Sequence, residues 1–266
     1  MTTPVALTIA GSDSSAGAGV QADLKTFAAL GVYGTSVITA LTAQNTRGVT
    51  AVHPVPASFV TAQLEAVFAD IDIGAVKIGM VGDATIIDAI ASALERLAPK
   101  AVVLDPVMVA TSGDRLLAAD AVGALKTKLI PLATIITPNL PEAASLVNEE
   151  VASNAAAIEA QGRRLLALGS SAVLVKGGHG DGPESRDTLI TANGVETLSA
   201  PRIATGNTHG TGCSLSSAIA AGLAKGEDLT TAVRNAKAFV SAAIAAADRF
   251  SVGHGHGPIH HFHRFY

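Results

Sequence analysis

Residues 208–213 have the residue types and spacing of a turn that binds anions. They read THGTGC and are followed directly by an apolar run of helical period, residues 214–225. Glycines let a backbone approach a ligand closely, and the first amides of a helix have no partner within the helix and lie at the positive end of its dipole. Gly210, Thr211 and Gly212 therefore predict an anion hole that suits a phosphoryl group during its transfer.

Cys213 is the only cysteine of the chain and stands at the end of this turn. A thiol at a helix N-terminus is expected to have a lowered pKa and more thiolate character. A lone cysteine is more commonly a small residue of the core, and the residues alone leave that alternative open. The glycines that precede Cys213 favour a place at the reacting centre.

A second glycine-rich segment, residues 11–19, follows an apolar strand and leads into a helix. Residues 17–22 fit a relaxed dinucleotide fingerprint, G-x-G-x-x-A. However, these glycines come several residues after the strand, and the next strand ends near Gln44 and Asn45 without an acid to bind a ribose hydroxyl. A loop that shapes a small-molecule pocket is the better interpretation. A P-loop kinase is excluded, because the chain has no G-x-x-x-x-G-K-[ST] run.

Four further polar side chains could bind a substrate, a metal ion or a phosphate. The carboxamide of Gln44 can both donate and accept, which suits the edge of a planar nitrogen heterocycle, although an ordinary polar loop is the alternative. Asp105 and Glu142 could hold Mg²⁺ directly or through its waters, or could be capping acids. Lys176 could bind a nucleotide phosphate as a point charge, or could extend along the surface into solvent.

The tail, residues 253–263, contains five of the eight histidines and invites a metal-binding interpretation. Adjacent His260 and His261 would point in different directions in an extended chain, and no cysteine or acid lies nearby to complete a ligand set. We therefore expect a packed or frayed tail.

Apolar runs of strand length alternate with segments of helical period along the chain. Strands are expected at residues 5–10, 36–41, 75–78, 101–104, 133–136 and 172–175, followed by a hairpin of 188–191 and 195–198 around Asn193-Gly194. Helices are expected at residues 20–28, 59–68, 83–97, 155–168, 214–225 and 229–247. This order predicts an α/β fold with a mostly parallel central sheet and helices on both faces.

Ligands of such sheets bind beyond the carboxyl ends of the strands. The residues that lie just after predicted strands should therefore converge at one edge of the sheet; they are Gly11, Gly79-Met80, Asp105, Asn139 and Lys176.

The composition bounds the class of protein. With 266 residues and no linker-like stretch, the chain is expected to form one domain, residues 1–266. The hydrophobic fraction of 48% includes only 3% aromatic residues, so aliphatic side chains must fill the core. A net charge of −4 argues against a broad nucleic-acid interface. One cysteine, no secretory signal and no long apolar stretch predict a cytoplasmic protein without a membrane partner.

Seven segments, in this order, resemble the hydroxymethylpyrimidine/phosphomethylpyrimidine kinase family of thiamine biosynthesis, which has the ribokinase-like fold. They are residues 10–13, 17–23, 44–46, 105–108, 137–142, 176–179 and 209–213. The glycine–histidine tail also resembles the end of that family, so the resemblance covers essentially the whole chain. The ordered set is specific, whereas its glycine-rich pieces alone would not be.

The resemblance implies ATP-dependent phosphorylation of 4-amino-5-hydroxymethyl-2-methylpyrimidine and then of its monophosphate, giving the diphosphate. It implies that Gln44 pairs with the pyrimidine ring and that Gly11, Asp23, Met80 and Val107 lie around the substrate pocket. It further implies that Asn139, Thr208 and Lys176 bind ATP, that Asp105 and Glu142 hold Mg²⁺, and that residues 210–213 form the anion hole. A small flap near the substrate site and a homodimer are implied as well. Residues 44–52 are our candidate for a lid.

Many relatives that act on sugars have an aspartate base where this chain has Cys213. A base helps only while the nucleophile still carries a proton, as the hydroxymethyl group does. The nucleophile of the second step is a phosphate oxygen that is already anionic, and an aspartate beside it would repel it. We hypothesise that Cys213 serves both acceptors because a thiol can remain neutral.

Two alternatives stay open. A pyridoxal kinase would have the same fold and the same anion hole, and Gln44 discriminates only weakly between the two ring systems. A binding protein that senses the pyrimidine or a nucleotide, without catalysis, is the alternative from another class. The anion hole, the two acids and Cys213 argue against a sensor, which needs no group at a reacting centre.

Overall fold

Eight strands form one central sheet in the part of the chain that the computed structural model describes, residues 3–108, 118, 121–178, 182–249 and 251–266. The strands are β1 (Val5–Ala10), β2 (Tyr33–Ile38), β5 (Ala75–Ile78), β6 (Val102–Leu104), β7 (Ile135–Ile136), β8 (Ala172–Val175), β9 (Glu184–Thr191) and β10 (Gly194–Pro201). Their order across the sheet is β10-β9-β8-β7-β6-β5-β1-β2. The pairs from β8 to β2 are parallel, while β9 and β10 continue the sheet as an antiparallel hairpin.

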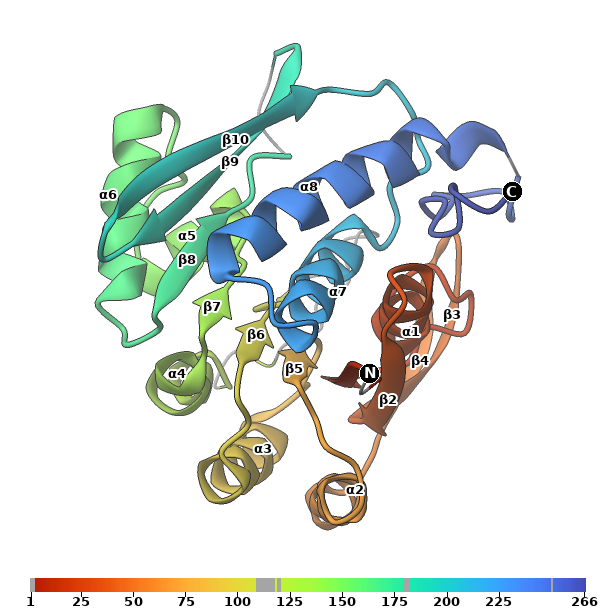
Figure 1. Cartoon of the computed structure of the whole chain (residues 1–266), viewed down its shortest axis with the longest axis vertical. Coiled ribbons are helices and arrows are strands. Elements are labelled where there is room, and N and C mark those ends of the chain that lie inside the picture. Colours follow the sequence, from red (N-terminus) through yellow and green to blue (C-terminus); the bar gives the residue numbers. More distant parts are fainter. Residues whose placement is uncertain (1–2, 109–117, 119–120, 179–181, 250) are drawn as a thin grey trace.

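Helices cover both faces of this sheet, as the alternation of elements predicted (Figure 1). One face carries α2 (Ala57–Phe68), α3 (Ala84–Leu97), α4 (Ala121–Ala124), α5 (Leu140–Val147) and α6 (Ala155–Leu166), with short π and 3₁₀ turns at Leu125–Leu129 and Ile130–Leu132. The other face carries α1 (Gly19–Ala29), α7 (Thr211–Ala224) and α8 (Leu229–Ala245), and the 3₁₀ turn Ala247–Arg249 follows α8. The mostly parallel α/β architecture is confirmed.

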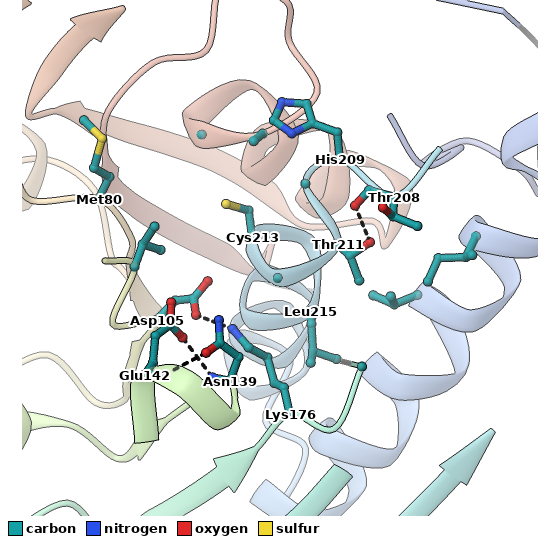
Figure 2. Close-up of a pocket in the computed structure, with 18 of the residues that line it drawn as sticks. Met80, Asp105, Asn139, Glu142, Lys176, Thr208, His209, Thr211, Cys213 and Leu215 are labelled. Atoms are coloured by element: carbon teal, nitrogen blue, oxygen red, sulfur yellow. Dashed lines mark hydrogen bonds and ion pairs between the residues drawn. The ribbon is translucent and has the colours of Figure 1, made fainter. Parts of the chain in front are cut away.

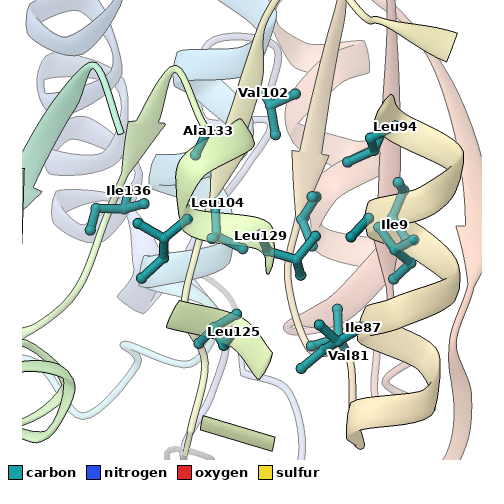
Figure 3. Packing of buried hydrophobic residues seen from close by; sticks show 14 of the residues in the cluster. Ile9, Val81, Ile87, Leu94, Val102, Leu104, Leu125, Leu129, Ala133 and Ile136 are labelled. Carbon is teal, nitrogen blue, oxygen red and sulfur yellow. The ribbon is translucent and has the colours of Figure 1, made fainter. Parts of the chain in front are cut away.

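Large branched side chains fill the first face (Figure 3). Ile9 points toward α3, which contributes Ile87 and Leu94 to the same cluster, and Leu104 lies beside Leu129 of the π turn. The helix α3 begins where the sequence predicts, because the side chain of Asp83 accepts a hydrogen bond of 2.9 Å from the Ile86 amide.

Small side chains fill the second face around α7. The helix is rich in serine and alanine, and Ser214, Ser216 and Ser217 are fully buried. It packs against the faces of β1, β5 and β6 that carry Ala6, Ala75 and Val103. Small residues on both sides let the helix lie close to the sheet. As a result its N-terminus stands at the carboxyl edge, where a parallel sheet binds ligands.

The small flap is a separate antiparallel pair, β3 (Ala40–Asn45) and β4 (Gly48–Pro54), with a register irregularity at Ala43/Gln44. The prediction of one strand over residues 36–41 was wrong, because the chain leaves the main sheet between β2 and β3. Thr39 lies at the break: its amide donates to the Ala10 carbonyl at 3.0 Å and its hydroxyl to the Met80 carbonyl at 2.7 Å. The apolar run at residues 36–41 includes the end of β2 and the start of β3, so its pattern alone cannot indicate that the chain changes sheets within it.

Candidate active site

A cavity of about 980 Å³ lies at the carboxyl edge of the sheet, between the loop after β1, the flap, and the N-terminus of α7 (Figure 2). The predicted site residues that line it are Gly11, Gln44, Met80, Asp105, Val107, Asn139, Glu142, Lys176, Thr208, Gly210, Thr211, Gly212 and Cys213. His179, which belongs to the motif at residues 176–179, lies outside the described residues. The convergence of strand ends predicted from the sequence is therefore present in the fold.

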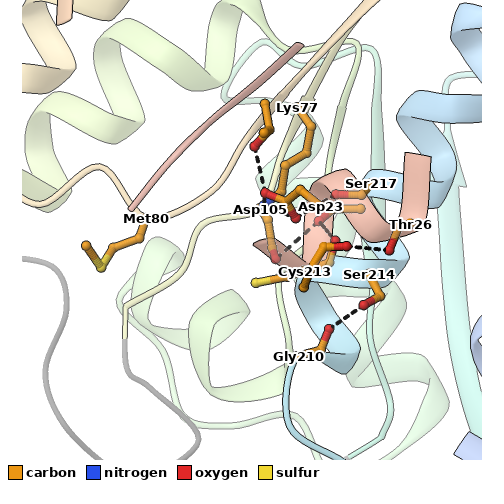
Figure 4. A network of polar contacts seen from close by, with 12 residues as sticks. Asp23, Thr26, Lys77, Met80, Asp105, Gly210, Cys213, Ser214 and Ser217 are labelled. Carbon is orange, nitrogen blue, oxygen red and sulfur yellow. Dashed lines mark hydrogen bonds and ion pairs between the residues drawn. The ribbon is translucent and has the colours of Figure 1, made fainter. Parts of the chain in front are cut away.

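Asp23 does not line this cavity, which corrects its expected place around the substrate pocket. Its carboxylate is fully buried between β5 and α7, where Lys77 Nζ lies 2.8 Å from Oδ2 (Figure 4). The hydroxyls of Thr8 and Ser217 also donate to it, at 2.6 Å and 2.7 Å. Burial alone would lower the pKa of Lys77, but Asp23 above all raises it, so the lysine is a fixed cation.

The glycine turn has the geometry that its sequence predicts. Gly210 is the N-cap of α7 at φ +80°, and a Cβ there would overlap the carbonyl oxygen of Gly17. The amides of Thr211 and Ser214 donate to the carbonyls of Thr208 and Gly210, at 3.2 Å and 2.9 Å. The other amides of the first turn, those of Gly212 and Cys213, are of the kind that a helix leaves without a partner inside the helix, and both residues line the cavity.

A charged cluster of Asp105 and Lys176 lies beside this turn (Figure 2). Lys176 Nζ is 2.8 Å from Asp105 Oδ1, and the hydroxyl of Thr137 donates to the same oxygen at 3.1 Å. A Cβ on Gly212 would lie 3.2 Å from Lys176 Nζ and 3.6 Å from Asp105 Oδ2, so the absence of a side chain there keeps the turn open toward both charges. With its side chain only 14% exposed, Lys176 is not a surface lysine.

Glu142 both caps a helix and faces the cavity. The Asn139 side chain accepts from the Glu142 amide and Glu142 Oε2 accepts from the Asn139 amide, each at 2.8 Å, which confirms the capping interpretation. Burial raises the pKa of Glu142 and Asp105 adds to this, whereas Lys176 opposes it. Burial alone would lower the pKa of Lys176, but the carboxylates of Asp105 and Glu142 raise it.

The oxygens of Asp105, Glu142 and Asn139 fit a hard cation such as Mg²⁺, which prefers oxygen ligands and keeps several waters. Among the described residues, no group of three or more histidine, cysteine, aspartate or glutamate side chains could hold a metal ion by itself.

Cys213 has the opposite protonation tendency from the one expected of a helix N-terminus. Burial raises the pKa of its thiol to about 11, and the neighbouring cation of Lys77 only partly offsets this. The expectation of more thiolate character was wrong because the sequence does not show how far the surrounding fold, which leaves Cys213 half-buried, removes water from the thiol. The thiol is neutral at pH 7 and lines the cavity.

The sequence analysis missed a hydrogen-bonded pair that joins the two glycine-rich segments. His209 Nε2 lies 2.7 Å from Asp13 Oδ2, and both side chains are buried. Burial alone would raise the pKa of Asp13, but hydrogen bonds from His209, Ser15 and Ala18 lower it to about 2. The sequence Asp13-Ser-Ser indicates only a local turn, in which an aspartate side chain accepts from the amide two residues later, as Asp13 does from Ser15 at 2.8 Å. It does not indicate the partner His209.

The far end of the cavity was missed as well. The apolar side chains of Leu215, Val240 and Ile244 line it, beside an ion pair in which Lys237 Nζ lies 2.8 Å from Asp187 Oδ2. An apolar wall with a few polar groups suits a planar base and its sugar. The sequence analysis looked for site residues just after the strands of the parallel sheet. These residues do not follow such a strand, so that criterion could not find them.

An anion-binding helix N-terminus beside a buried lysine–aspartate pair, at the edge of a doubly covered parallel sheet, defines a phosphoryl-transfer enzyme of the ribokinase-like class. Residues 13–260 match the model of the family described as phosphomethylpyrimidine kinase. The chain belongs to this family, the kinases of thiamine biosynthesis that its motifs resemble.

Known proteins similar to this chain agree with that assignment. A hydroxymethylpyrimidine/phosphomethylpyrimidine kinase of Rhizobium meliloti (strain 1021) is 58% identical over 264 residues, which cover 99% of each chain. The phosphomethylpyrimidine kinase of Clostridium difficile 630 is 48% identical with a TM-score of 0.81, covering 90% of this chain and 99% of that one. Bacillus subtilis pyridoxal kinase, solved as an ADP complex, is 36% identical with a TM-score of 0.90 and 98% coverage of both.

The described residues include no helix long and apolar enough to cross a membrane. The expected packing of the tail is also present: His260 and His261 are buried at 3% and 5% exposure.

We expect Lys77→Met to destabilise the protein by about 3–5 kcal/mol, because it leaves the Asp23 carboxylate buried without its cation. Urea denaturation measures this as a lower unfolding midpoint. The matched control is Arg96→Ala, which breaks the exposed pair with Glu65 and should cost below about 1 kcal/mol. Equal losses in the two variants would show that the buried pair does not contribute as described.

We expect Gly212→Ala to lower kcat roughly 100-fold, because the added Cβ fills the space between the turn and the Lys176–Asp105 pair. Its thermal stability should stay equal or rise, since alanine is the better helix former by about 1 kcal/mol. Gly123→Ala in α4 is the control, because a Cβ there meets nothing within 4 Å. An unchanged kcat for Gly212→Ala would exclude the turn from the reacting centre.

Proposed function

We propose that the protein is the ATP-dependent kinase that phosphorylates 4-amino-5-hydroxymethyl-2-methylpyrimidine and then converts the monophosphate to the diphosphate. The observation that carries this proposal is that one cavity is lined by Gln44 of the flap, by Cys213, and by the glycine turn with its Lys176–Asp105 pair. Such a cavity has room for a ring, a reacting hydroxyl and a polyphosphate in sequence. Family membership supplies the substrate.

The flap end of the cavity supplies the groups for the pyrimidine. Gln44 lines the cavity, and its Oε1 lies 3.3 Å from the Thr42 hydroxyl, which donates to the Ser12 carbonyl at 2.9 Å. Its carboxamide can both donate to and accept from an aminopyrimidine edge. Met80 and Val107 provide apolar contacts from the strand ends. A Cβ on Gly11 would overlap the end of the Met80 side chain, so the glycine leaves the space that this side chain occupies.

Phosphoryl transfer then requires mainly alignment and charge stabilisation. Lys176, Thr208 and Asn139 bind the nucleotide phosphates, and the amides of residues 210–213 stabilise the migrating γ-phosphoryl group. The hydroxymethyl oxygen forms the new O–P bond as the bond to the β,γ-bridging oxygen breaks. The bond electrons leave with ADP, and the hydroxyl proton passes to the thiolate form of Cys213, which is a small fraction at pH 7, or to water.

Mg²⁺ is the proposed metal, bound by Asp105 and Glu142 with Asn139 nearby, and it would neutralise charge on the phosphates. ATP is supported by the ADP found in the pyridoxal kinase of Bacillus subtilis. We further infer a single domain over residues 1–266, supported by one sheet that contains β1, β2 and the strands β5 to β10.

A cytoplasmic homodimer is the proposed form in the cell, without nucleic-acid or membrane partners. The net charge of −4 supports the absence of a nucleic-acid partner. The homodimer follows from the resemblance. Exposed apolar side chains such as Tyr33 at 61% and Phe59 at 60% are compatible with a contact between copies. The lid role of residues 44–52, which lie in the flap, stays a prediction.

ATP consumption with the hydroxymethylpyrimidine tests the activity directly. We expect turnover that depends on both substrates, with mono- and diphosphate identified by mass spectrometry. Binding of the pyrimidine without any ADP release would support the sensor instead.

The similarity to pyridoxal kinase, with a TM-score of 0.90, favours a second candidate activity. We expect kcat/KM to be higher for the pyrimidine than for pyridoxal, and the reverse order would assign the chain to vitamin B6 metabolism.

We expect Cys213→Ala to slow phosphorylation of the alcohol more than phosphorylation of the monophosphate in single-turnover assays. Because the thiol pKa is raised to about 11, the thiolate fraction grows as pH rises toward that value. The alcohol step of the native protein should therefore accelerate up to roughly tenfold per pH unit between about pH 7 and pH 9. The variant should lose this slope. Equal losses in both steps would contradict a proton-accepting role.

A further inference from the structure

The glycine–histidine tail, residues 253–261, has no part in the transfer chemistry described above, although it lies against the active-site walls. In Figure 1 the C-terminal coil stands beside the turn that joins β3 to β4. We call residues 253–261 the tail strap. Its backbone contacts two walls of the cavity that are far apart in the sequence.

The first contact is with the tip of the flap. Thr46 lies in the turn between β3 and β4, two residues after Gln44. Its carbonyl accepts from the His256 amide at 2.8 Å, and its hydroxyl accepts from the amides of Gly255 and His254 at 3.1 Å and 3.3 Å. One residue of the flap thus receives three hydrogen bonds from successive amides of the strap.

The second contact is with the glycine turn. The His209 amide donates to the Gly257 carbonyl at 3.0 Å, and the Ile259 amide donates to the His209 carbonyl at 3.4 Å, which forms a parallel bridge. On the other flank of the turn, His261 Nε2 lies 2.9 Å from the hydroxyl of Ser214. The strap therefore holds the residue before Gly210 and the residue after Cys213.

Close packing explains why glycine recurs in the strap. A Cβ on Gly253 or Gly255 would overlap Thr46, and one on Gly257 would overlap the side chain of Asn207. The alternation of glycine with histidine thus fits the backbone against the flap and the turn. It does not require a metal-binding role for the histidines.

We propose that the tail strap, acting through Thr46 and His209, positions the Gln44 flap relative to the anion hole at residues 210–213. The strap touches no reacting atom, so its residues are positioning residues. Misplacement of the flap by about 1 Å would move the acceptor hydroxyl away from the phosphoryl group, and such a shift can cost on the order of 100-fold in rate. This inference rests on the proposed function for the identity of the acceptor.

The test compares variants of both partners with matched controls. Gly255→Ala places a Cβ against the Thr46 carbonyl, and Thr46→Val removes the hydroxyl while keeping the shape of the side chain. Thr46→Ser keeps the hydroxyl. Gly206→Ala is the glycine control, because a Cβ there meets nothing within 4 Å.

We expect Gly255→Ala to lower kcat/KM for the pyrimidine about tenfold or more, with the KM for ATP changed by less than about twofold. Thr46→Val should show the same split with a smaller loss, and Thr46→Ser should recover activity to within about twofold of the native protein. Gly206→Ala should match the native protein in both constants. The proposal would be overturned if both Gly255→Ala and Thr46→Val had kinetic constants within twofold of this control. Equal rises in the KM for the pyrimidine and the KM for ATP would overturn it as well.

Hydrogen exchange provides a readout that does not depend on the substrate. Gly255→Ala and Thr46→Val should accelerate amide exchange in the flap, residues 40–54, and in residues 208–214, while the β5 and β6 amides stay protected. Unchanged exchange in both segments would refute the strap as a positioning element. Should the native protein leave the pyrimidine unmodified, the proposed function fails and this exchange pattern still decides the role of the strap.

Discussion

The close approach of the α7 N-terminus to the carboxyl edge of the sheet is the constraint on which the site depends. Unpaired amides can bind a phosphoryl group only if no side chain lies before them. Three glycines meet this condition: Gly17 and Gly210 pack backbone against backbone, and Gly212 leaves the space before Lys176 and Asp105 open. The Asp13–His209 pair then fixes the two glycine-rich segments to each other. The geometry follows from missing side chains as much as from those present.

The charges around this turn are balanced in pairs. Lys77 is held by Asp23 and Lys176 by Asp105, and the Glu142 carboxyl, whose pKa burial raises, interacts with the second pair. An aspartate in place of Cys213 would add a fourth carboxyl group to the region. Burial and the two existing carboxylates already raise the thiol pKa, and a neutral group there leaves the cations free to attract phosphate. This charge balance gives a physical reason for a thiol at position 213 where the acceptor itself is an anion.

The sequence predicted those parts of the fold and site that depend on local pattern. Continuous apolar runs predicted β1, β5 and β8 with their observed bounds, and residues after strand ends converged as the parallel sheet requires. The errors concern long-range packing. Asp23 was misplaced because its partner Lys77 is 54 residues away, and the Cys213 pKa was misjudged because depth of burial is a property of the whole fold. The same holds for His209, whose partner Asp13 lies 196 residues away.

The groups available for phosphate and for the ring belong to different elements of the fold. Asp105, Lys176 and the glycine turn come from strand ends and the α7 N-terminus, all fixed by the packed core. Gln44 comes from the flap, whose two strands form a sheet of their own and are largely exposed. A change of ring system can therefore occur in the flap without disturbing phosphoryl transfer. The chain is similar over 98% and 90% of its length to a pyridoxal kinase and to a phosphomethylpyrimidine kinase, so one overall fold is found with both ring systems.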